Sequence, residues 1–269
     1  MTEYINELYY DKPIPYKELL IYPVTMKDYL SFHWLISCLL LDKNSIPDIN
    51  VISMSYLRFL YHEAAEKEAP YVYMIKMLLC LVLHIDVNEE MSFYVDNNNK
   101  AYFSVKGIEY NSTDFDNIVK IIFEQNCIKG IDNTIQKEVR DALEKAEQYK
   151  TQQNNRKMCS LEEQMICVLI STSLKMQDIY DLTIRKFEKI LQRVDAKLHY
   201  QIYLSASMSG MVTFKDENAI NHWMNDLTKE DRYEDVKVDM DVMRDKIEGV
   251  NHVLLPPKKM AKLPDLIWE

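Results

Sequence analysis

The sequence IRKFEKILQRVDAKLHYQIY, residues 184–203, is the longest segment of this chain with regular helical periodicity. Its apolar side chains recur every three or four residues, at Ile184, Phe187, Ile190, Leu191, Val194, Leu198, Ile202 and Tyr203. This spacing places apolar residues on one face of a helix. The segment therefore predicts a long amphipathic helix that follows Thr183 and ends before Gly210.

Other segments combine apolar periodicity with residues that typically cap helices. Thr25, with Asp28 three residues later, predicts a helix that runs to about Asp42. Two further helices are expected over residues 55–67 and 71–83, where Pro at the start of the second suits a first helical turn. Capping boxes are expected at Thr113 with Asp116 and at Ser160 with Glu163.

Near residue 91 the spacing of apolar residues changes from one typical of helices to one typical of strands. Met91–Val95 and Ala101–Val105 flank the segment DNNNK at 96–100, and Asn is well suited to left-handed turn positions. Residues 108–110 could add a third short strand. The predicted fold class is thus mainly α, a multi-helix bundle with a small β-hairpin or meander insert around residues 91–110.

Composition predicts three regions along the chain. Residues 1–150 would form a helical N-terminal region that contains the β-hairpin. The polar run TQQNNRK at 151–157 is the best linker candidate, so a helical C-terminal region is expected over 158–250. The remainder, 251–269, contains Pro256, Pro257 and Pro264 and is expected to be a Pro-rich extended tail.

Charge and residue usage disfavour several classes of function. The net charge of −10 argues against nucleic-acid binding, which relies on Lys and Arg. The longest apolar run, 71–85, contains Lys76 and His84 and is too short to span a membrane. Five widely spaced cysteines indicate free thiols in a reducing cytoplasm, and no Cys/His spacing suits a metal. Four glycines are too few for a phosphate-binding loop, and no cofactor is expected.

No motif for catalysis is present. The six histidines form neither H-E-x-x-H nor H-x-H, and Ser209-Gly210 lacks the preceding glycine of a nucleophile elbow. Adjacent carboxylates such as Glu162-Glu163 point about 100° apart on a helix and do not converge. Fifteen methionines and eighteen tyrosines suit an adaptable protein-binding surface, although ordinary core packing explains them equally well. The chain is therefore expected not to be an enzyme.

One part of the chain, residues 90–226, resembles a known class of phage protein. The resemblance lies in the order of the expected helices and of several short sequence segments. These segments are GIEYNSTDFD at 107–116, FEQN at 123–126, SLEE at 160–163, DLTIRKF at 181–187, HYQIY at 199–203, MSGMVTFK at 208–215 and HWM at 222–224. This order resembles small tail-assembly and morphogenesis proteins of phages of Gram-positive bacteria. Residues 1–90 carry no such resemblance.

The resemblance implies a tail assembly chaperone that binds the tape measure protein or the tail tube protein in the cytoplasm of the bacterial host. In or beside the segments that carry the resemblance, the residues that could face such a partner are Tyr200, Tyr203, Met208, Met211 and Trp223. The same residues could instead build a C-terminal core. The chain could also form a homo-oligomer.

The sequence leaves three other functions open. The chain could be a virion structural component of the neck or baseplate, which composition does not exclude. It could be an enzyme whose His and acidic residues converge only in space. It could also be an interaction module that triggers or blocks a host immunity protein, although no sequence feature favours this.

Overall fold

The computed structural model describes residues 4–131 without 47, 68 and 87–90, residues 142 and 145, and residues 159–210 and 222–225. The chain divides into two compact units, Met1–Asn225 and Asp226–Glu269, and every described residue belongs to the first. The predicted linker at 151–157 and the predicted tail at 251–269 lie outside the described residues. The predicted division into three regions stays a prediction.

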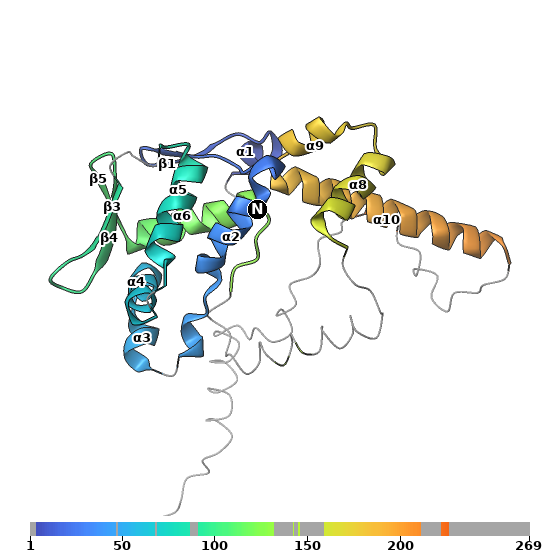
Figure 1. Ribbon diagram of the computed structural model, residues 1–269. Coiled ribbons are helices and arrows are strands. Elements are labelled where there is room, and N and C mark those ends of the chain that lie inside the picture. The colour runs from blue at the N-terminus through green and yellow to red at the C-terminus, as the bar shows by residue number, and fades with distance from the viewer. Residues whose placement is uncertain are drawn as a thin grey trace, which may run out of the picture. The chain divides into compact units, whose positions relative to one another are not determined.

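Short elements begin the chain and lead into two longer helices (Figure 1). In order they are α1 (Ile5–Tyr9), β1 (Ile14–Tyr16), β2 (Leu19–Ile21), η1 (Met26–Asp28), α2 (Tyr29–Ile36), η2 (Ser37–Leu40), η3 (Lys43–Ser45), α3 (Ile49–Ser53), α4 (Tyr56–Glu66) and α5 (Tyr71–Leu83). Strands β1 and β2 form an antiparallel pair with Ile14 opposite Ile21. The helices expected at 55–67 and 71–83 are confirmed as α4 and α5.

In the part of the chain that the structure describes, a three-stranded antiparallel sheet and four further helices follow. They are β3 (Met91–Val95), β4 (Ala101–Val105), β5 (Ile108–Asn111), α6 (Ser112–Gln125), α8 (Leu161–Ser171), α9 (Met176–Asp181) and α10 (Ile184–Met208). The hairpin is confirmed, with Met91 opposite Val105 and Val95 opposite Ala101. Figure 1 shows this sheet beside α4 and α6, which contact β4 and β5. The mainly α class with a small β insert is therefore confirmed, whereas the bundle arrangement stays a prediction.

Two helix starts differ from the sequence-based expectation. The capping box of α6 is formed by Asn111 and Asp114, not by Thr113 and Asp116, because β5 continues to Asn111 and the helix begins immediately after it. Thr25 does not cap a helix through its side chain. The predicted continuous helix from Thr25 is instead the succession η1, α2 and η2, which ends at Leu40.

A single hydrophobic core joins the described parts of the chain. It gathers residues of α2, α4, α5, β4 and α6, and also Val168 of α8, Ile179 of α9, and Ile184 and Phe187 of α10. Aromatic rings form its sheet side: Phe103 stacks on Tyr110 at 5.1 Å between centroids and meets Phe115 edge-on at 5.9 Å. The first turns of α10 are thus part of the same core as the N-terminal half.

Candidate functional site

The start of α10 is held against the N-terminal half by a cluster of polar contacts around Thr183. The Thr183 hydroxyl accepts a hydrogen bond from the Lys186 amide at 3.2 Å, which caps the helix, and donates to Asp11 Oδ1 at 3.2 Å. Lys186 Nζ also lies 2.6 Å from Asp11 Oδ2. One carboxylate therefore binds two residues of the first helical turn, and this places α10 relative to the chain's beginning.

Backbone hydrogen bonds also join the start of α10 to the N-terminal half of the chain. Thr25 and Thr183 form an antiparallel β-bridge, in which the Ile184 amide donates to the Val24 carbonyl at 2.9 Å and the Met26 amide donates to the Leu182 carbonyl at 2.8 Å. Thr25 is extended in this bridge and occupies the N-cap position of η1, but its side chain makes no capping hydrogen bond. The bridge also fixes the rotation of α10 at its first residue.

One apolar face runs along most of α10. Its members are Ile184, Phe187, Leu191, Val194, Leu198 and Ile202. The separations are three or four residues, which keeps these side chains on one face of the helix, and from Ile184 to Leu198 they follow the heptad spacing of a helix that packs against another helix. Ile184 and Phe187 are buried in the core, and Leu191 and Val194 are half-buried. Farther on, Leu198 is 50% exposed and Ile202 is 63% exposed. The face that anchors the helix thus continues, uncovered, beyond the core.

The sequence-predicted residues lie on the same helix and on a short segment beside it. Tyr200 is half-buried and its ring meets His222 at 4.8 Å, almost perpendicular. Trp223 is half-buried, and its carbonyl accepts a 2.7 Å hydrogen bond from Arg193 Nη1, which also donates to the Asn225 carbonyl. Tyr200 therefore contacts His222, the residue next to Trp223 in the chain.

The remaining predicted residues are separate from this contact. Tyr203 is 41% exposed and stacks on His199 at 6.2 Å. Met208 is the last residue of α10 and its side chain is exposed. Met211 lies outside the described residues. Leu198 and Tyr200 are two residues apart, about 200° around a helix of 3.6 residues per turn. The exposed apolar face and the Tyr200 contact are thus on opposite sides of α10.

Helix α8, which packs on α10, has its own exposed apolar residues. Ile166 and Ile170 are one helical turn apart and are both exposed, whereas Val168 between them is buried. Sequence reasoning did not single out Ile166, Ile170, Leu198 or Ile202 as binding residues. Periodicity identified Leu198 and Ile202 as apolar-face residues, but periodicity does not reveal where the covering elements end.

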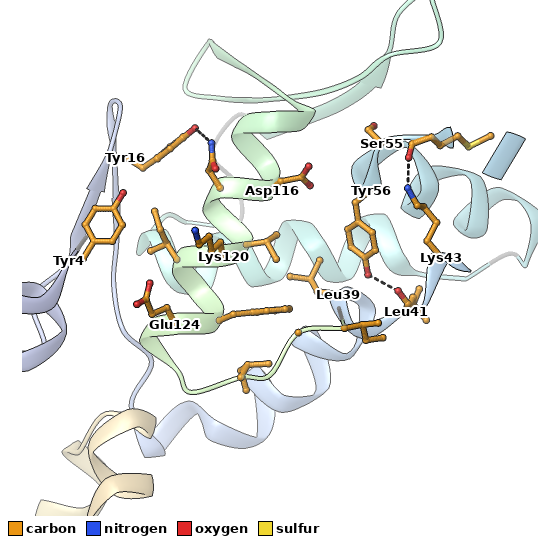
Figure 2. A pocket seen from close by; sticks show the side chains of 18 residues that line it. Tyr4, Tyr16, Leu39, Leu41, Lys43, Ser55, Tyr56, Asp116, Lys120 and Glu124 are labelled. Carbon is orange, nitrogen blue, oxygen red and sulfur yellow. Dashed lines mark hydrogen bonds between the residues drawn. The ribbon is translucent and has the colours of Figure 1, made fainter. Parts of the chain in front are cut away.

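A groove lies on the N-terminal half, along the outer side of α6. Its volume is about 1240 Å³, and its walls include the end of η2, the start of α4 and residues 128–131. Figure 2 shows Asp116, Lys120 and Glu124 following one another along α6 at this groove, with Leu39, Leu41 and Tyr56 on the opposite side. This mixture of charge and apolar surface was not predicted, because the walls are far apart in the sequence.

The described residues show neither a metal centre nor a membrane span. Within the described ranges, no group of three or more His, Cys, Asp or Glu side chains is placed to hold a metal ion. No helix among these residues is both long and apolar enough to cross a membrane. The absence of a cofactor and of catalysis stays a prediction.

Comparison with known proteins connects the α8–α10 part to a phage-associated family. Residues 150–228 match the family model described as the YomV second domain. The matched range contains α8, α9, α10 and the segment around Trp223. This segment is therefore similar to a domain of a phage-associated family. No curated protein and no solved structure matches the chain.

Proposed function

We propose that this chain is a non-enzymatic phage tail assembly protein, a chaperone that holds the tape measure or tail tube protein through the exposed apolar face of α10. One observation carries the proposal: an apolar face with helical spacing that is buried at Phe187 continues, exposed, at Leu198 and Ile202. The face lies within the part of the chain that matches a phage-associated family.

The geometry suits the binding of an amphipathic helix. An exposed apolar stripe on a rigid helix is the surface against which a partner helix lays its own apolar face. Covering what is still exposed of Leu198 and Ile202 would contribute roughly 1 kcal/mol each. Met208 and the α8 residues Ile166 and Ile170 supply further exposed apolar surface in the matched domain. Several modest contacts of this kind give a reversible complex, which a chaperone requires.

Net charge and location complete the proposal. A net charge of −10 keeps a protein with exposed apolar surface soluble and repels other copies of it. The chaperone would act in the host cytoplasm, before the tail tube assembles, and would bind neither nucleic acid nor membrane. It would release its partner when the tube forms.

The test is affinity purification of the tagged chain from phage-producing cells. The wild-type chain should recover the tape measure or tail tube protein, and the double variant Leu198→Glu/Ile202→Glu should not. A matched control, Gln192→Glu/Ser207→Glu, adds the same two charges on other sides of α10 and should retain the partner. Both control positions are exposed.

Two results would contradict the proposal. One is recovery of the same partner by the Leu198→Glu/Ile202→Glu variant, and the other is recovery of no phage protein by the folded wild-type chain. Mass spectrometry of purified virions then separates a chaperone from a structural component. A chaperone is absent from mature particles, whereas a neck or baseplate component is present at a fixed copy number.

A further inference from the structure

A second pocket lies where the turn between β3 and β4 meets the starts of α4 and α6. Helix α4 contacts both α6 and β4, so three elements of the N-terminal half meet at this corner. The pocket has a volume of about 610 Å³ and is lined by residues drawn from 50–58, 98–102 and 111–113. This volume lies within the range of pockets that hold small molecules.

The charge of this pocket differs from that of the groove on α6. Among the residues that the structure describes, its charged lining consists of Arg58 and Lys100, which are both cations. Asp48 and Asp96 belong to adjoining segments, but neither lines the pocket, and each accepts hydrogen bonds from backbone amides. Two positive charges that face one small space favour a negatively charged occupant.

Arg58 is held in place but keeps part of its hydrogen-bonding capacity. Its side chain is half-buried, and its Nε atom donates to Asn99 Oδ1 at 2.8 Å. No acceptor in the described part of the chain pairs with its two Nη atoms. The planar guanidinium therefore offers its outer N–H groups as a fork, which suits two oxygens of one anion.

Two amide side chains add further donors. Asn99 Oδ1 accepts from Arg58, and Asn111 Oδ1 accepts from the Asp114 amide at 2.9 Å. Because each amide oxygen is engaged, the group that each side chain has left to offer is its NH₂ donor. The exposed Lys100 ammonium has no partner within the described ranges. The pocket thus gathers two cations and two amide donors.

A chain of hydroxyl groups fixes the wall behind these donors. Ser55 Oγ donates to Ser112 Oγ at 3.0 Å, and Ser112 Oγ donates to the Ala101 carbonyl at 3.0 Å. The same Ser55 oxygen accepts from the Arg58 amide and caps α4. These bonds join α4, α6 and β4 to one another, so the donors are held in place before any ligand arrives, which lowers the cost of binding.

We propose that this pocket binds a phosphoryl group, either as free phosphate or carried by a small organic molecule. A phosphoryl group has close to two negative charges near neutral pH and three acceptor oxygens, which match two cations and two amide donors. A carboxylate has one charge and would leave one cation unpaired. The half-buried Tyr102 ring also lines the pocket and gives the organic part of a phosphate ester a flat surface.

The overall charge of the chain does not prevent this binding. The net charge of −10 repels anions at long range. At physiological ionic strength, charges beyond about 8 Å are largely screened, so the two cations of the pocket outweigh the distant carboxylates. The site lies outside the family-matched residues 150–228 and is separate from the apolar face of α10.

The experiment is isothermal titration calorimetry of the full chain with inorganic phosphate, ribose 5-phosphate and ribose. Ribose 5-phosphate should bind with a Kd below about 1 mM, and ribose should give no binding heat. Tighter binding of ribose 5-phosphate than of inorganic phosphate would identify an organic ester as the ligand, whereas equal affinities would identify free phosphate. Arg58→Gln and Lys100→Gln should each weaken the binding by about threefold to tenfold, because each removes one charge-assisted contact.

Controls separate this site from non-specific attraction and from the surface on α10. Lys27→Gln removes an exposed lysine that does not line the pocket, and it should leave the affinity unchanged. Leu198→Glu/Ile202→Glu should also leave it unchanged, so the two proposals can fail independently. Lys100 is exposed, so its variant should fold even if Arg58→Gln does not. Binding of neither phosphate compound, binding of ribose as tight as that of its phosphate, or full affinity of Lys100→Gln would overturn the inference.

Discussion

Truncating an apolar side chain should lower the stability of the fold much more at the start of α10 than near its end. Phe187 is 1% exposed, so Phe187→Ala removes a ring from a packed core and should lower the free energy of unfolding by about 3–5 kcal/mol. Ile202 is 63% exposed, so Ile202→Ala should change that free energy by less than about 0.5 kcal/mol. The better helix propensity of Ala offsets part of the lost contact.

Urea unfolding of the full chain, followed by circular dichroism at 222 nm, measures both effects. With an m-value of about 3 kcal/mol per M, Phe187→Ala should lower the midpoint by at least about 1 M, and Ile202→Ala should hardly move it. Partner binding should show the reverse order of sensitivity once folding is controlled. Ile202→Ala should weaken the affinity for the recovered partner about fivefold, since roughly 1 kcal/mol of burial is lost.

One outcome would refute this reasoning directly. If Ile202→Ala lowered the free energy of unfolding by more than about 1.5 kcal/mol, Ile202 would be packed inside the folded chain. The apolar face would then be an internal contact and could not hold a partner.

Three further perturbations test the contacts of Thr183, the contacts of Asp114 and the packing at Gly130. Thr183→Ala removes the cap of α10 and a bond to Asp11, and it should lower the urea-unfolding free energy by about 1–2 kcal/mol. Desolvation raises the pKa of Asp114, but the Lys17 ammonium at 2.6 Å and other donors outweigh it and hold this pKa below 3.8. Its stabilising contribution is therefore complete above pH 3.8 and is lost as the pH falls through the lower folded value, so the advantage over Asp114→Asn in urea unfolding should shrink below pH 3.8. Gly130→Ala places a Cβ 2.8 Å from the Phe123 ring, and it should lower the urea-unfolding free energy by about 1–3 kcal/mol.

Local chemistry made several elements predictable. Helix α5 occupies the predicted range 71–83, because thirteen almost entirely apolar residues follow a proline that suits a helix start. The capping box at Ser160 is confirmed, with the Ser160 side chain accepting from the Glu163 amide. These features depend on residues within four positions of one another, so neighbouring letters are enough to predict them.

The prediction at the start of α6 failed for a non-local reason. Thr113 and Asp116 have suitable spacing, but pairing of β4 with β5 keeps the chain extended as far as Asn111. The Asn111 side chain then accepts from the Asp114 amide, and the helix begins at Ser112. Strand pairing therefore decided between two capping pairs that are equally acceptable locally.

The sequence alone determined the helical class, the β-hairpin and the apolar face of α10, because each follows from periodicity and from contacts between near neighbours. Only the tertiary structure decided which part of that face is used for the core. The β-bridge at Thr183 and the Asp11 contacts fix the start of α10, and the core covers Phe187 but not Ile202. The groove on α6 depended likewise on walls that are up to 127 residues apart, from Tyr4 to Ile131. Burial is a property of the whole packed chain, and for that reason no local pattern distinguishes an anchoring residue from a binding residue.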